Sequence, residues 1–205
     1  MSSLGLRMDF IDRPFVISAL TFGFGSVTGF LFSAVFPALR GAMVALLLVR
    51  VLEPLQSAVT IGSAAVVLLI FINNAVPVLL SFLYPILVAK ISWTPPLTRS
   101  KTQALFSGYS LLAAFLLGFI DLGATLGTIL FERGAPFATY LLNHSWVHGP
   151  IEFTLILLAI SEPARIASRQ VSSGLVLFER KDRVLLFSCL LGLLASAILE
   201  FALNV

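Results

Sequence analysis

The chain has 205 residues, of which 59% are hydrophobic and 11% are charged, and its mean hydropathy is +1.04. At this composition a fold surrounded by water would expose large apolar patches, so we predict one integral membrane domain over residues 1–205 without a separate soluble catalytic domain. The net charge of +3 does not indicate a nucleic-acid partner, because the basic residues lie in short clusters between apolar runs.

Five apolar runs are long enough to cross a bilayer, whose hydrocarbon core is about 30 Å thick, and they predict an all-α transmembrane bundle. The runs cover residues 14–37, 59–89, 104–131, 147–164 and 184–203. Pro77 and Pro85 interrupt the second run, and proline disturbs the preceding helical turn. We expect one kinked helix in this region, and a re-entrant pair is the alternative.

Residues 38–57, between the first two runs, form a leucine- and valine-rich stretch interrupted by Arg40, Arg50 and Glu53. This pattern predicts an amphipathic segment that lies along the outer interface of the membrane.

Lysine and arginine accumulate in short cytoplasmic loops, so their distribution predicts the orientation of the chain. A cytoplasmic N-terminus and an external C-terminus place most basic residues inside the cell: Arg7, Arg13, Lys90, Arg99, Lys101, Arg165, Arg169, Arg180, Lys181 and Arg183. Only Arg40, Arg50 and Arg133 then lie outside. We therefore predict a multi-pass protein of the cell membrane in this orientation, in contact with membrane lipids.

Glycines recur four residues apart as Gly25 and Gly29 in the first run and as Gly123 and Gly127 in the third. This spacing allows helix backbones to approach closely within a membrane. We favour packing within one protomer. The alternative is a seam between copies, and for a homo-oligomer a dimer is the favoured state.

Three ionisable residues lie near the ends of the last two runs. His148 and Glu152 are four residues apart, so they share one face of a helix, and Glu200 lies at a similar depth in the final run. Hydrocarbon tolerates such groups only where they are paired or line a cavity. They are therefore the leading candidates for a functional site.

Deeper in the bilayer, Asn73 and Asn74 fall near the middle of the second run and Asp121 near the middle of the third. Asparagine at such positions typically forms hydrogen bonds between helices. Asp121 should be protonated, hydrogen-bonded or exposed to water, and with Asn73 it is a candidate for a relay.

Three segments in order carry a resemblance to a known family: Phe71-Ile72-Asn73-Asn74, His148-Gly149-Pro150-Ile151-Glu152 and Ala197-Ile198-Leu199-Glu200-Phe201. Together they resemble the stage II sporulation protein M family of integral membrane proteins. The resemblance implies a five-span fold and partner proteins within a membrane complex. It also implies an intramembrane polar cluster of Asn74, His148, Gly149, Glu152 and Glu200.

Three functional hypotheses follow. The first is a non-enzymatic scaffold or permease-like component whose polar cluster holds the helices together, without a cofactor. The second is a transporter or channel for an ion, a proton, or a small polar or lipid solute, with a cavity lined by the same residues. The third is a metal-dependent intramembrane hydrolase that uses His144, His148, Glu152 and Glu200 as ligands. A cavity that extends from Glu152 towards Asp121 favours transport over the scaffold.

Overall fold

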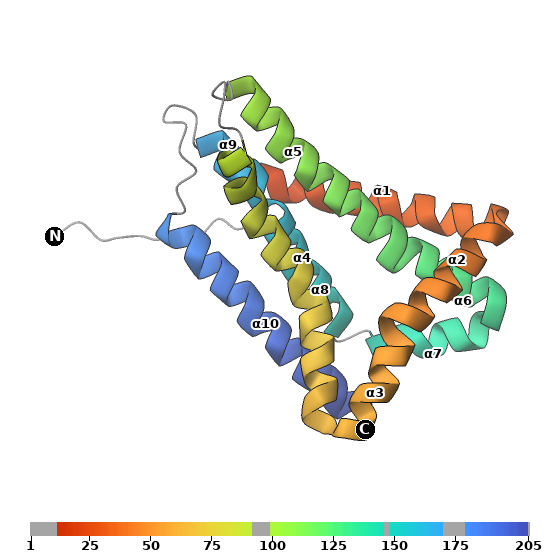
Figure 1. Ribbon diagram of the computed structural model, residues 1–205. Helices are drawn as coiled ribbons and strands as arrows, with labels where there is room; N and C mark the ends of the chain where they lie inside the picture. Colours follow the sequence, from red (N-terminus) through yellow and green to blue (C-terminus); the bar gives the residue numbers. More distant parts are fainter. Residues whose placement is uncertain (1–11, 92–98, 146–147, 170–178, 205) are drawn as a thin grey trace.

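In the computed structural model every regular element is a helix, within the described residues 12–91, 99–145, 148–169 and 179–204 (Figure 1). In chain order the elements are α1 (Arg13–Val35), α2 (Pro37–Leu47), η1 (Leu48–Leu52), α3 (Glu53–Ile61), α4 (Ser63–Ile91), α5 (Arg99–Leu116), η2 (Leu117–Ala124), α6 (Thr125–Arg133), α7 (Ala135–Ser145), α8 (His148–Ile160), α9 (Glu162–Arg169) and α10 (Arg180–Asn204). The segments η1 and η2 are π-helical, and each continues directly into the α-helices on either side of it.

Among these residues, five stretches are long and apolar enough to cross a membrane: Arg13–Val35, Pro37–Ile61, Ser63–Val88, Lys101–Arg133 and Arg180–Leu203. Four of them overlap predicted spans. The predicted run 147–164 differs, because Ser161 divides it into α8 and α9. The stretch Pro37–Ile61 is long enough to be the fifth candidate span, because α2, η1 and α3 follow one another without a break.

The helices form two arms that diverge from one end of the molecule (Figure 1). One arm contains α1, α5, η2 and α6, and the other contains α4, α8 and α10. We call their common end the vertex, where α9 packs against both arms. The continuous run from α2 through η1 to α3, here the bridging helix, joins the far end of α1 to the start of α4.

An ionic cluster ties the two arms together at the vertex. Asp12 precedes α1 and caps it by accepting a hydrogen bond from the backbone N–H of Phe15 at 3.1 Å. The Arg165 side chain of α9 donates to both carboxylate oxygens of Asp12, at 2.6 and 3.0 Å. It also contacts Glu162 at 3.1 Å, and Glu162 is only 1% exposed. Arg165 therefore joins the start of α1 to α9.

Glycines allow α1 to pack closely against η2 in the first arm. A Cβ atom on Gly29 would collide with the backbone oxygen of Phe119, and one on Gly123 would collide with that of Ser26. The buried Ser33 hydroxyl lies within hydrogen-bonding distance of the Ala124 carbonyl oxygen, at 3.1 Å. Both glycine pairs are thus used inside the protomer, and a homo-oligomer would need another surface.

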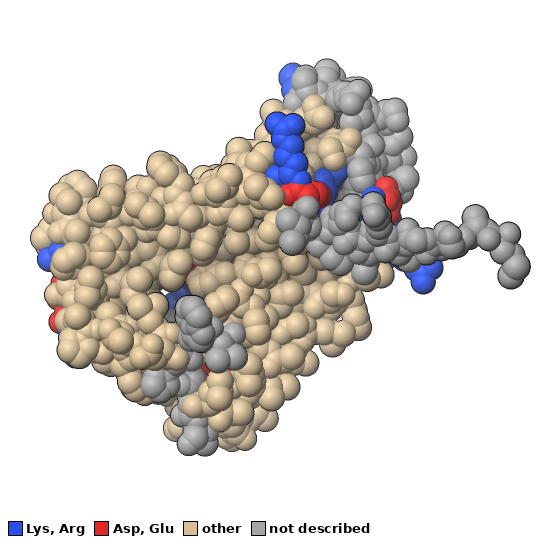
Figure 2. All heavy atoms as spheres, turned by 180° about the vertical axis from the view of Figure 1, so that it is seen from behind, with Lys and Arg blue, Asp and Glu red and all other residues tan. Residues whose placement is uncertain are grey.

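Charged side chains gather at the ends of the visible face, and uncharged residues cover most of the surface between them (Figure 2). Large apolar side chains on the outside of the arms are strongly exposed, among them Leu20 at 70%, Phe24 at 67% and Phe187 at 66%. Such a broad apolar surface is typical of a protein that contacts lipid.

Replacing Gly29 or Gly123 with alanine should destabilise the fold by about 1 to 3 kcal/mol, because the new methyl group meets a backbone that cannot move aside. Gly23→Ala is the matched control, since nothing lies within 4 Å of a Cβ atom at that position. Thermal unfolding midpoints in detergent should fall for the first two variants only. An equal effect of all three would contradict the close approach of α1 and η2.

Arg165→Gln should cost about 3 to 5 kcal/mol, because it leaves the buried Glu162 carboxylate without its cation. Lys181→Gln serves as the control, because the Lys181–Glu179 pair has both side chains about half exposed, at 51% and 50%. Unfolding in a denaturant series measures both variants. If Arg165→Gln matches the control, the vertex does not depend on this ion pair.

Candidate functional site

A cavity of about 710 Å³ lies between the two arms, and we call it the vestibule. Its lining includes residues from both arms, the bridging helix and α7. It also includes seven of the sequence-predicted site residues: Asn73, Asn74, Asp121, His148, Gly149, Glu152 and Glu200. Residues that are far apart in the sequence therefore line one cavity.

His148 and Glu200 meet across two helices. His148 begins α8 and is 5% exposed, and Glu200 lies near the end of α10. The His148 Nε2 atom is 3.8 Å from Glu200 Oε1, so the two side chains are neighbours, although the distance is longer than a hydrogen bond. The two ends meet because α8 and α10 pack side by side in opposite directions.

Glu152 lies one helical turn beyond His148, between Asn74 on α4 and Ser196 on α10. Within the described part of the chain, three buried polar atoms of this region have no hydrogen-bond partner: Glu152 Oε1, His148 Nδ1 and Ser196 Oγ. Buried polar atoms without partners are costly. The cluster is therefore suited to bind a further polar group or a proton.

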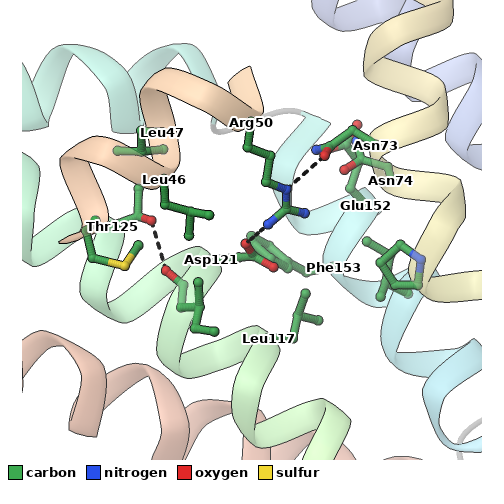
Figure 3. A pocket seen from close by; sticks show the side chains of 14 residues that line it. Leu46, Leu47, Arg50, Asn73, Asn74, Leu117, Asp121, Thr125, Glu152 and Phe153 are labelled. Atoms are coloured by element: carbon green, nitrogen blue, oxygen red, sulfur yellow. Dashed lines mark hydrogen bonds and ion pairs between the residues drawn. The ribbon is translucent and has the colours of Figure 1, made fainter. Parts of the chain in front are cut away.

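Arg50 is the functional residue that sequence reasoning missed. The sequence predicts it on an amphipathic segment outside the cluster, but its side chain extends from the bridging helix between the two arms (Figure 3). Its Nη1 atom donates to Asp121 Oδ1 at 2.7 Å, and its Nε atom donates to Asn73 Oδ1 at 3.1 Å. One guanidinium thus links the bridging helix, the first arm and the second arm.

Both residues of the Arg50–Asp121 pair lie in π-helical segments, Arg50 in η1 and Asp121 in η2. The hydroxyl of Thr125, the first residue of α6, donates to the carbonyl oxygen of Ile120 in η2, five residues earlier, at 2.9 Å. Short π-helical segments often occur at functional sites. A charged residue inside each of two apolar runs was the signal available in the sequence, since Asp121 needs a partner and Arg50 can supply it.

A smaller cavity of about 200 Å³, the inner chamber, adjoins the vestibule at this pair. The two cavities have a common wall formed by Arg50, Asn73, Asn74, Asp121, Thr125, Glu152 and Phe153. Figure 3 shows Arg50 within this wall, with Asp121 on one side and Asn73 on the other. A polar path therefore extends from Glu152 to Asp121.

The apolar core lies next to the inner chamber. Leu117 and Ile156 belong to this core and also line the chamber. Further core residues come from α4, α5 and α10, with Phe82, Ala114 and Cys189 as examples, and all three are at most 4% exposed. The vestibule and the inner chamber thus lie on one side of a packed core.

A metal site gains no geometric support from the described residues, which contain no group of three His, Cys, Asp or Glu side chains arranged to hold an ion. The side chain of His144 lies outside the described residues. The four-ligand site that includes it stays a prediction.

No family model, curated protein or solved structure matches this chain. The resemblance to the stage II sporulation protein M family accordingly stays a prediction from the sequence motifs.

Single cysteines in a Cys189→Ser background should report water in the two cavities, because Cys189 is the only native cysteine and is fully buried. In reconstituted membranes a soluble thiol reagent should modify Leu122→Cys in the vestibule quickly and Leu47→Cys in the inner chamber more slowly. Phe187→Cys, on the exposed apolar surface, should not react, because thiols ionise poorly in hydrocarbon. Equal protection of all three positions would show that water does not enter the vestibule.

Proposed function

We propose that this protein is a permease-like membrane protein that binds a small polar or charged solute between its two arms and passes it across the bilayer. The observation that carries the proposal is the vestibule, in which three acidic residues, one arginine and one histidine from four helical elements line a common space. Charged groups within a membrane are rare unless they serve a pathway or pair with one another. Here Arg50 pairs with Asp121, His148 lies near Glu200, and all five residues line the cavity.

The proposed membrane placement uses five spans: α1, α4, the run from α5 to α6, the pair α8 and α9, and α10. The supporting contacts place the starts of α1 and α10 and the end of α4 together around α9. The vertex is cytoplasmic in this proposal, in agreement with the basic residues near it. The bridging helix then lies across the outer end, because it joins the far end of α1 to the start of α4.

A scaffold is the second candidate function, and one observation favours it. Arg50 hydrogen-bonds to both arms, so the polar cluster also holds the two arms together. In that role the protein would hold partner proteins of a membrane complex, as the family resemblance implies. The two functions differ in whether solute crosses the membrane.

Flux into liposomes containing the purified protein tests the proposal. The probes are radiolabelled sodium, methylamine, acetate and glycine, which together cover cations, an anion and a zwitterion. At least one probe should enter tenfold or more faster than into protein-free liposomes. Glu152→Gln should remove most of this flux, because it removes an ionisable carboxyl from the wall between the two cavities.

Glu132→Gln is the matched control for the flux measurement. Glu132 pairs with Arg40 at 2.8 Å and lines neither cavity, so its loss should leave the flux unchanged. If no probe enters faster than into empty liposomes, the permease proposal is wrong and the scaffold remains. Flux that is equally sensitive to Glu132→Gln and Glu152→Gln would also contradict it.

A further inference from the structure

The wall between the vestibule and the inner chamber presents both signs of charge to the cavities. Arg50 supplies the positive charge, and Asp121 and Glu152 supply the carboxyl groups. The Arg50 and Asp121 side chains are 38% and 29% exposed, so both remain accessible from the cavity although they pair with each other. A solute that reaches the wall therefore meets a guanidinium and a carboxylate side by side.

The pair restricts which solute can pass from one cavity to the other. Separating Arg50 from Asp121 leaves two charges unpaired in largely apolar surroundings, which is unfavourable. A cation could replace Arg50 at Asp121 but would leave the guanidinium without a partner, and an anion would leave the carboxylate without one. A solute that carries both charges can pair with Arg50 and with Asp121 at the same time.

The other groups of the wall complement the same kind of solute. The Arg50 guanidinium presents a planar set of N–H donors that suits a carboxylate or phosphate group, and the amides of Asn73 and Asn74 lie beside it. Glu152, which lies beside Asn74 on the other side of Arg50 from Asp121 (Figure 3), offers an ammonium group a second carboxyl partner in the same wall. The inner chamber, at about 200 Å³, is below the roughly 300 Å³ of a pocket for a drug-sized ligand, so it fits a small group.

We infer that the wall formed by Arg50, Asp121 and Glu152 is a binding site for a small zwitterion, with the acidic group on Arg50 and the ammonium group on a neighbouring carboxyl, that of Asp121 or Glu152. The inference rests on the proposed permease function and narrows its substrate class. The zwitterion has two possible sources: a free amino-acid-like solute, or the headgroup of a zwitterionic lipid whose chains lie along the apolar side of the vestibule. Leu55, Val59 and Leu126 belong to that apolar lining.

Equilibrium dialysis of the purified protein with radiolabelled glycine tests the free-solute source. Glycine should bind saturably, and methylamine or acetate alone should compete at least tenfold more weakly. Arg50→Gln should weaken glycine binding tenfold or more and bring methylamine level with glycine as a competitor. In Asp121→Asn the selectivity should change in the opposite sense, so that acetate competes as strongly as glycine. A purely structural role for the pair predicts no such exchange of selectivity.

Arg40→Gln is the matched control, because Arg40 forms the same type of ion pair with Glu132 at 2.8 Å outside both cavities. It should leave glycine binding unchanged. Unfolding midpoints of all variants in detergent show whether each one is folded. Where Arg50→Gln does not fold, Arg50→Lys keeps the charge but loses the planar donor set, and a selective loss of glycine affinity in that variant supports the site equally.

Liposomes with acyl-labelled phosphatidylethanolamine test the lipid source, with acyl-labelled phosphatidylglycerol as the anionic comparison. Faster movement of the zwitterionic lipid between leaflets, lost in Arg50→Gln but kept in Arg40→Gln, supports a headgroup as the ligand. The inference is overturned if neither glycine nor phosphatidylethanolamine is recognised, or if methylamine alone binds as tightly as glycine in the unaltered protein. Sodium or methylamine flux without zwitterion binding would overturn only this inference and leave the permease proposal intact.

Discussion

Arginine–carboxylate pairs join separate helical elements of this protein at three places. Arg165 binds Asp12 at the vertex, Arg50 binds Asp121 in the middle, and Arg40 binds Glu132 near the end of α6. In apolar surroundings an unpaired charge is costly, so Arg165 and Arg50 constrain the elements that hold their partners, whereas Glu132, the partner of Arg40, is 47% exposed. Helices that gain little from hydrophobic attraction in lipid are positioned by these pairs and by close glycine contacts.

The three pairs differ in their surroundings, and the difference bears on function. The Arg165 side chain is 11% exposed and that of its second partner Glu162 only 2%, which suits a permanent connection. The Arg50 and Asp121 side chains are more open and face two cavities. An ion pair that lines a cavity can exchange partners with a solute, whereas an ion pair enclosed in packed protein cannot. The proposed site therefore lies in the middle of the molecule rather than at the vertex.

Much of the polar cluster could be predicted from the sequence. The spacing of His148 and Glu152 places them on one helical face, and Glu200 lies at a matching depth in the last apolar run. Two expectations differ from the structure. The run 147–164 is divided at Ser161, because hydropathy does not detect a single irregular turn within an apolar segment. Arg50 faces the cavity, because the direction of a side chain depends on which helices enclose it.

The helical class, the approximate positions of four long apolar helices and the places of the ionisable groups along them could be predicted from the sequence, because these depend on local hydropathy and on the 1.5 Å rise of a helix. The divergence of the arms from a common vertex and the contacts of Arg50 with Asp121 and Asn73 between two cavities came only from the three-dimensional packing. Partners that are 71 and 23 residues away from Arg50 in the chain leave no local pattern. Only the packing of the bridging helix across both arms brings them within hydrogen-bonding distance.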